Sequence, residues 1–154
     1  MHNTIGDLDE DGLEDIIVAS KDGPILFHRR VSQSPLRWET YPIEIPPGAG
    51  GGKAVQVADI DLDGQLDMAV GCENAIDGKI GPFWLSYKQK PTEIHWIPTS
   101  ISGPDGFINN LIQIADLDDD GDLDVVTVEE KGPYLAKGYK GKELGVIWYE
   151  DPER

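Results

Sequence analysis

The sequence predicts an all-β fold built from three similar units in tandem. The nine-residue pattern D-x-D-x-D-G-x-x-D occurs three times, beginning at residues 7, 59 and 116. A short apolar run follows each copy, as expected for a strand after a turn. The chain also contains 18 glycines and 11 prolines but no long stretch with apolar residues at helical spacing. This composition favours short strands joined by many turns.

Each unit is expected to contain about four short strands that align from one unit to the next. The expected first strands are 54–58 and 111–115, with only the shortened segment 1–6 in the first unit. The expected second strands, directly after the acidic loops, are 16–19, 68–70 and 125–128. The third strands open with glycine, at 23–28, 81–86 and 145–150. Fourth strands that run into a proline are expected in two units, at 37–41 and 93–97.

Glycine- and proline-rich segments at 46–53 and 100–106 are the expected connections between units. We therefore expect one repeat domain over residues 1–154, with units at approximately 1–45, 53–101 and 109–154. The acidic patterns repeat after 52 and 57 residues, an interval that suits a four-stranded propeller blade. The predicted fold is a β-propeller-like array of three four-stranded antiparallel blades, with incomplete outer blades.

Three blades are too few for a closed ring, because closed propellers usually have four to eight blades. The array is expected to stay open unless a longer parent chain or self-association completes it. We favour a fragment of a larger propeller as the origin of the sequence. We also expect the isolated chain to form a homo-oligomer, because open sheet faces and edges promote association.

Each acidic loop is a candidate metal site. Four carboxylates within nine residues repel one another unless a cation lies between them, and the glycine at the sixth position allows a sharp turn. A hard cation with oxygen ligands fits, and calcium is favoured because magnesium tolerates crowded all-protein ligation poorly. The alternative is a solvated polar turn without metal, since Asp and Gly are common in turns. Three copies with the same Asp spacing favour the metal.

We predict three calcium sites that use the carboxylates at loop positions one, three, five and nine and the backbone carbonyl at position seven. The first site would comprise Asp7, Asp9, Asp11, Leu13 and Asp15, the second Asp59, Asp61, Asp63, Gln65 and Asp67, and the third Asp116, Asp118, Asp120, Asp122 and Asp124. An EF-hand is excluded because its bidentate Glu comes at position twelve and because strands flank these loops. The expected role is structural, since each cation would tie the first strand of a unit to the second.

Unit by unit, the sequence resembles the FG-GAP and VCBS-type repeats of calcium-binding propellers, the group that includes the integrin α-subunit head. The matching features are the acidic loop, the apolar strand after it and a Gly-x-x-Trp strand beyond, from Gly81 to Trp84 and from Gly145 to Trp148. The resemblance implies an extracellular or cell-envelope location, although no signal peptide is visible. Trp84 and Trp148 occupy equivalent places, with Leu26 in the first unit, which favours a role in packing between blades.

The charge balance restricts the partners. The chain has 29 acidic against 13 basic residues and a formal net charge of -16, of which three divalent cations would neutralise part. This acidity disfavours nucleic acid and anionic membrane surfaces. No apolar stretch approaches the ~20 residues of a membrane span, so no membrane insertion is expected. The single Cys72 excludes an intrachain disulfide framework.

A ligand-binding surface is expected on the rim opposite the acidic loops, where the loops between the second and third strands differ among the units. Glu73 and Glu130 both follow the last Asp of their acidic loop by six residues. The other candidates on this rim are Asn74, Asp77, Lys131 and Tyr134. Ordinary solvated loop residues are the alternative interpretation of the same pattern.

The function expected first is a non-enzymatic, calcium-stabilised propeller module that binds a protein or a carbohydrate. No Ser/His/Asp or Cys/His constellation supports catalysis. An enzyme is the second possibility, as part of a propeller resembling those of polysaccharide lyases or sugar dehydratases. Its acid-base candidates would be Glu73, His95, Glu130 and Tyr134. A purely structural assembly unit is the third possibility.

Overall fold

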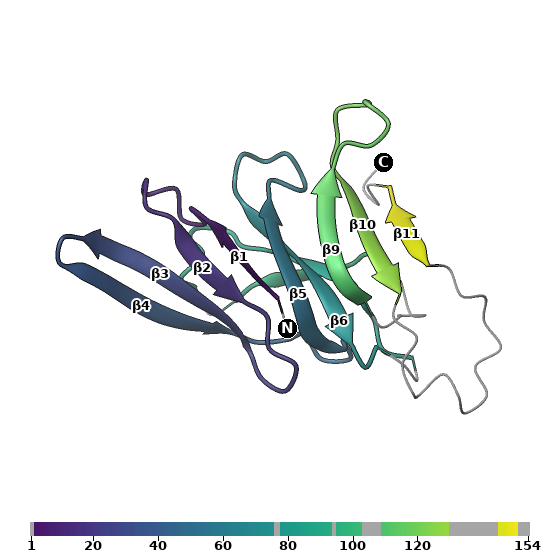
Figure 1. The fold of residues 1–154 in the computed structure, drawn as a ribbon, viewed down its shortest axis with the longest axis horizontal. Coiled ribbons are helices and arrows are strands. Elements are labelled where there is room, and N and C mark those ends of the chain that lie inside the picture. The colour runs from purple at the N-terminus through teal and green to yellow at the C-terminus, as the bar shows by residue number, and fades with distance from the viewer. Residues whose placement is uncertain (1, 76–77, 94, 103–108, 130–144, 151–154) are drawn as a thin grey trace.

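The computed structural model describes residues 2–75, 78–93, 95–102, 109–129 and 145–150. These residues form three separate antiparallel sheets and no helix (Figure 1). None of the sheets closes into a barrel. The all-β, propeller-like arrangement predicted from the repeats is therefore confirmed. In the described part of the chain, no helix is long and apolar enough to cross a membrane.

The first sheet contains β1 (Asn3–Gly6), β2 (Asp15–Val18), β3 (Ile25–Gln33) and β4 (Leu36–Ile43), in that order. β1 is short, as expected, but it pairs with β2 over its whole length, so the first unit has all four strands. β3 extends well beyond the predicted end at residue 28 because it forms a long hairpin with β4. Pro42 lies within β4, which is an edge strand and tolerates a residue without an N–H.

The second sheet contains β5 (Gly51–Ala58), β6 (Asp67–Glu73), β7 (Phe83–Ser86) and β8 (Ile97–Ser100), in that order. The prediction of a fourth strand at 93–97 is wrong in position, because β8 begins where that segment ends. Trp96 instead packs edge-on against Tyr87, with ring centroids 5.0 Å apart, beside the buried core. Packing rather than strand pairing therefore holds Trp96, just before β8.

The third sheet contains β9 (Asn109–Ala115), β10 (Asp124–Glu129) and β11 (Val146–Tyr149), with β10 in the middle. The described part of this unit thus has three strands. The first strands of the three sheets lie side by side, since β5 contacts both β1 and β9. The acidic loops β1–β2, β5–β6 and β9–β10 all project from the same edge of the array (Figure 1). This edge is called the acidic-loop edge below.

Two hydrophobic cores join the three sheets. The first core lies between the first and second sheets and includes Ile17, Phe27, Val55, Met68 and Phe83. The second core lies between the second and third sheets and consists of Ala54, Ile60, Ala69, Trp84, Ile112 and Val125. Side chains alternate across a strand, so each inner sheet face contributes to one core. The second sheet is therefore covered on both faces, which explains its unbroken burial along β6 from Asp67 to Cys72.

The strand register corrects one alignment made from the sequence. Trp84 pairs with Ala69 and Trp148 pairs with Val126, each partner being two residues after the last Asp of its acidic loop. The residue in the same place of the first sheet is Phe27, which pairs with Ile17, and not Leu26. Aligning the third strands on their opening glycines thus misplaced the first unit by one residue. An aromatic side chain occupies this position in all three sheets.

Candidate metal centres

The three acidic loops share one backbone conformation. The residues at the fourth position have positive φ, at 55° for Glu10, 57° for Leu62 and 61° for Asp119. The glycines at the sixth position also have positive φ, at 87° for Gly12, 90° for Gly64 and 96° for Gly121. Glycine adopts this conformation without a steric cost, whereas other residues pay roughly 1–2 kcal/mol. The predicted role of the sixth-position glycine is confirmed, and the strained fourth position is a shared feature that the sequence did not reveal.

Hydrogen bonds within each loop close the turn in the same way. The first Asp accepts a bond from the N–H of the sixth-position glycine, in the pairs Gly12–Asp7 at 2.8 Å, Gly64–Asp59 at 3.1 Å and Gly121–Asp116 at 3.0 Å. The fifth-position Asp accepts a bond from the N–H of the seventh residue, in the pairs Leu13–Asp11 at 2.9 Å, Gln65–Asp63 at 2.8 Å and Asp122–Asp120 at 3.2 Å. The aspartate spacing therefore defines a specific loop before any ligand is considered.

The ninth-position Asp lies buried at the base of each loop. The relative exposures of Asp15, Asp67 and Asp124 are 0%, 2% and 0%. One oxygen of each carboxylate accepts a bond from the N–H of the second loop residue, at 3.1, 3.1 and 2.8 Å. Burial raises the pKa of Asp15, and burial followed by repulsion from Asp61 raises the pKa of Asp67 to about 7. The buried carboxylates of Asp15 and Asp67 therefore lack sufficient compensation within their loops.

The carboxylates at positions one, three and nine converge in every loop. Their oxygens lie within 4.8 Å of one another in the groups Asp7–Asp9–Asp15, Asp59–Asp61–Asp67 and Asp116–Asp118–Asp124. Oxygens 2.3–2.6 Å from one calcium ion would have such separations. Among the described residues, the buried Oδ1 atoms of Asp9, Asp59 and Asp124 have no hydrogen-bond partner. Three clustered carboxylates, one of which has an unpaired buried oxygen in each cluster, fit a hard cation.

The structure brings together three of the four carboxylates predicted for each site. Position five lies outside the three groups, and its oxygens have other partners. In the second loop, Asp63 accepts bonds from both the backbone N–H and the side-chain amide of Gln65. In the first loop, Asp11 accepts bonds from Leu13 and from Arg29. The predicted seventh-position residues thus contact the fifth-position Asp through their N–H groups.

Arg29 distinguishes the first loop from the other two. It lies on β3, where its Nε donates to Asp9 and its Nη2 donates to Asp11 at 2.8 Å. The bond to Asp9 is the main cause that raises the pKa of Arg29. The strand register places Ser86 and Glu150 at the equivalent positions of the other sheets. The first loop therefore has a positively charged partner from its own sheet. The sequence did not indicate this contact, because the predicted third strand ended at residue 28 and β3 continues past it.

The predicted ligand-binding rim lies only partly within the described residues. Glu73 is at the far end of β6, and its carboxylate pairs with Lys21 at 2.7 Å and Lys53 at 3.8 Å. The hydrogen bond from Lys21 is the main cause that lowers the pKa of Glu73. Asn74 follows with a positive φ of 58°. The remaining rim candidates, Asp77, Glu130, Lys131 and Tyr134, lie outside the described residues.

The acid-base candidates of the enzyme hypothesis do not converge where they can be located. His95 is exposed in the connection between β7 and β8. This connection lies at the acidic-loop edge. Its two ends, Ser86 and Ile97, pair with each other. The adjacent Leu85 pairs with Met68, the residue directly after the second acidic loop. Glu73 lies at the opposite end of the same sheet.

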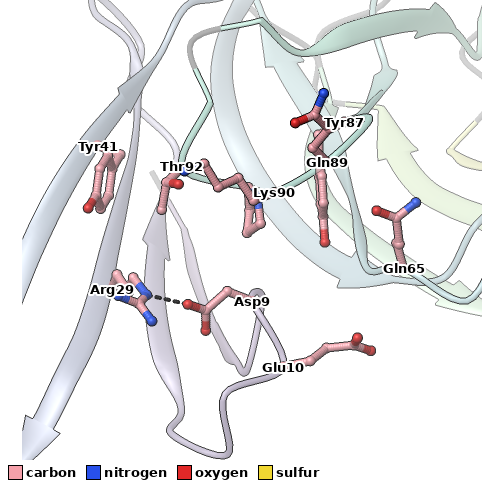
Figure 2. A pocket seen from close by; sticks show the side chains of 10 residues that line it. Asp9, Glu10, Arg29, Tyr41, Gln65, Tyr87, Gln89, Lys90 and Thr92 are labelled. Carbon is pink, nitrogen blue, oxygen red and sulfur yellow. Dashed lines mark hydrogen bonds and ion pairs between the residues drawn. The ribbon is translucent and has the colours of Figure 1, made fainter.

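A cavity of about 430 Å³ opens beside the first acidic loop, between the first and second sheets (Figure 2). Figure 2 shows Arg29 joined to Asp9 on one side of this space and Tyr87 and Gln65 on the other, with Lys90 and Thr92 between them. Its full lining is Asp9, Glu10, Arg29, Tyr41, Gln65, Tyr87, Gln89, Lys90, Pro91 and Thr92. Burial raises the pKa of Tyr87 to about 12. No sequence pattern indicated this cavity, because its residues come from five separate segments.

Three antiparallel sheets with adjacent first strands, each carrying an acidic loop at the same edge, define a propeller-like repeat protein. Residues 7–70 match the family model described as the FG-GAP-like repeat. The match extends from the first acidic loop into β6, after the second loop, so the resemblance to FG-GAP-type repeats is confirmed over that span. No curated protein and no solved structure matches the chain.

Proposed function

We propose that the chain is a calcium-stabilised, propeller-type binding module. The observation that supports this function is the threefold recurrence of converging carboxylates at positions one, three and nine of the acidic loops. A divalent cation at each group would offset the mutual repulsion of these carboxylates and would join the first two strands of each sheet. Calcium suits the site better than magnesium, because magnesium retains several waters and seldom binds in an all-protein cage.

The proposed location is extracellular or in the cell envelope. Calcium modules in extracellular proteins often bind at about 10⁻⁴–10⁻³ M, which requires calcium at comparable concentration. The net charge of -16 is compatible with such a setting, because bound cations would reduce it.

We propose that the ligand-binding site of the module is the cavity between the first two sheets and that its ligand is a carbohydrate. Amide, hydroxyl and charged groups from Gln65, Gln89, Thr92 and Lys90 line this cavity together with Tyr41. Such groups can donate and accept the hydrogen bonds that sugar hydroxyls require. The opposite rim is the alternative surface for a protein ligand, although the Glu73 carboxylate is already paired with two lysines.

Thermal unfolding with and without a chelator tests the cation part of the proposal. Removal of divalent ions should lower the midpoint, and added calcium should restore it more effectively than magnesium at equal concentration. A ligand at 100 times its Kd stabilises a protein by about 2.7 kcal/mol per site, so the shift should be readily measurable. A midpoint that responds to neither the chelator nor calcium would overturn the proposal.

A glycan array in calcium, followed by two matched variants, tests the binding part. Gln89→Ala should weaken any glycan signal because Gln89 lines the cavity and is exposed. Asn74→Gly keeps the positive φ on the opposite rim and should leave the signal unchanged. The reverse pattern would move the site to the rim, and the absence of any glycan signal would contradict a carbohydrate ligand.

A further inference from the structure

The two faces of each sheet have different and consistent roles in joining the array. In the second sheet, Met68 directly follows the last Asp of the acidic loop and packs in the first core, toward the preceding sheet. Ala69, one residue later, packs in the second core, toward the following sheet. Every sheet therefore has a preceding face and a following face, which the register identifies by position.

The first sheet uses only its following face within the chain. Ile17 and Phe27, which pair with each other, are fully buried against the second sheet. The alternate residues lie on the preceding face, where Ile5 pairs with Ile16. Ile5 is 62% exposed although it is an apolar residue in a strand. We call this preceding face of the first sheet the head face; its apolar residues include Ile5, Ile16, Val18 and Leu26, with Leu36, Trp38 and Pro42 on β4.

The third sheet shows the converse arrangement. Val125 and Ile112 on its preceding face are buried against the second sheet. The alternate residues Val126 and Trp148, which pair with each other, lie on its following face. Trp148 is 49% exposed, whereas its counterpart Trp84 is 4% exposed in the second core. We call this following face the tail face; its apolar residues are Leu111, Val126, Val128, Val146 and Trp148.

The head face and the tail face are the two halves of an interface that already forms twice inside the chain. A following face with a central aromatic residue packs on a preceding face between the first and second sheets and again between the second and third. The exposed head face and tail face have apolar residues at the same positions of the strand register as the faces that are buried in the two cores. We propose that the tail face of one chain packs on the head face of a second copy, so that two copies close a six-bladed ring.

This arrangement makes a definite prediction about stoichiometry and symmetry. Two copies that exchange head and tail faces form two identical interfaces and have six blades, within the four to eight blades usual for closed propellers. The interface joins different surfaces of the two copies, so a variant that damages either face removes both interfaces. A contact between two identical faces would behave differently, because damage to the other face would leave it intact.

Light scattering after size exclusion, over a range of protein concentrations in calcium, tests the proposal. The unmodified chain should show twice the monomer mass. Ile5→Glu on the head face and Trp148→Glu on the tail face should each give a monomer. The control Leu62→Glu replaces another exposed apolar residue, 52% exposed at the fourth position of the second acidic loop, where the first loop has Glu10 with the same positive φ, and should remain a dimer. Circular dichroism with thermal unfolding establishes that each variant is folded.

Mixing the two monomeric variants distinguishes head-to-tail packing from the alternatives. Ile5→Glu keeps an intact tail face and Trp148→Glu keeps an intact head face, so an equimolar mixture should regain the doubled mass through one interface. This mixed dimer should dissociate at a higher concentration than the unmodified dimer, which has two interfaces. A strictly monomeric unmodified chain would overturn the proposal. So would a dimer formed by Ile5→Glu alone or by Trp148→Glu alone.

Discussion

The guanidinium group of Arg29 bonds to the carboxylate of Asp9, one of the three converging groups of the first acidic loop. A second bond, at 2.8 Å, joins it to Asp11 in the same loop. The equivalent positions in the other two sheets hold Ser86 and Glu150, neither of which is a cation. The three loops therefore share a backbone but differ in their electrostatic balance. A divalent cation would compete with Arg29 in the first loop alone.

Replacement of Arg29 by Ser should make the first loop resemble the second. In chelator, Arg29→Ser should lower stability by up to about 1 kcal/mol, because partly exposed ion pairs are lost. The affinity of the first loop for calcium should rise roughly tenfold, which corresponds to about 1.4 kcal/mol, because Arg29 no longer competes with the ion. Calorimetric titration measures both the affinity and the number of bound ions.

The charge-matched control for Arg29→Ser is Arg37→Ser, because Arg37 is exposed on β4 away from the acidic loops. It should leave the calcium titration unchanged. Equal titrations for the unmodified chain and Arg29→Ser would show that Arg29 does not compete with the cation.

Replacement of Asp67 by Asn should have opposite effects with and without calcium. Asp67 is 2% exposed and lies in one group with Asp59 and Asp61. Without a cation, removal of its charge should stabilise the chain by on the order of 1–2 kcal/mol, because a buried, repelled carboxylate is costly. With calcium, the loss of a ligand should reduce the stabilisation by calcium. Urea unfolding in chelator and in calcium measures both, with the exposed Asp22→Asn as control; effects of the same sign in the two conditions would contradict the prediction.

Replacement of Trp84 by Ala should be far more costly than the same change at Trp148. Both residues hold the same place in the strand register, but Trp84 is 4% and Trp148 49% exposed. Trp84→Ala leaves a cavity in the second core and should cost about 3–5 kcal/mol. Trp148→Ala should cost less than about 1 kcal/mol when the chain is monomeric. Denaturant unfolding at a concentration below dimer formation makes the comparison, and similar costs would show that the second core does not depend on Trp84.

Replacement of Glu73 by Gln should lower stability at neutral pH but not in acid. The pKa of Glu73 is lowered chiefly by its bond from Lys21. A lowered pKa means that the ion pair contributes stability above the ordinary Glu value of about 4.3 and loses it as the pH falls through the native value. The expected difference is about 0.5–1 kcal/mol at pH 7 and close to zero near pH 3, because the pair is partly exposed.

Urea unfolding in chelator across this pH range tests the Glu73 prediction. Glu44→Gln is a suitable control, because Glu44 is an exposed carboxylate just after β4. A difference between Glu73→Gln and the unmodified chain that stays constant with pH would count against the ion pair as its cause.

Local sequence predicted the acidic loops well and the strand ends less well. The sixth-position glycines have the expected positive φ, and three of the four predicted carboxylates, at positions one, three and nine, lie together, whereas position five is outside these groups. Each loop is closed by bonds between residues at most seven positions apart, such as Leu8 to Asp15. The predicted position of β8 and the predicted counterpart of Trp84 in the first sheet were wrong, because both depend on pairing and packing with distant strands.

The sequence by itself determined the repeat number, the all-β class and the acidic loops, because each of these is encoded within a few consecutive residues. Only the tertiary structure decided which residues meet across the sheets. Arg29 reaches Asp9 from twenty residues away, the cavity collects residues from both sheets, and Ile5 and Trp148 lie on opposite outer faces. A shift of one residue in strand register moves a side chain to the other face of its sheet. The residues of a strand therefore do not by themselves determine which side chains they contact. The register of strand pairing in the folded chain determines it.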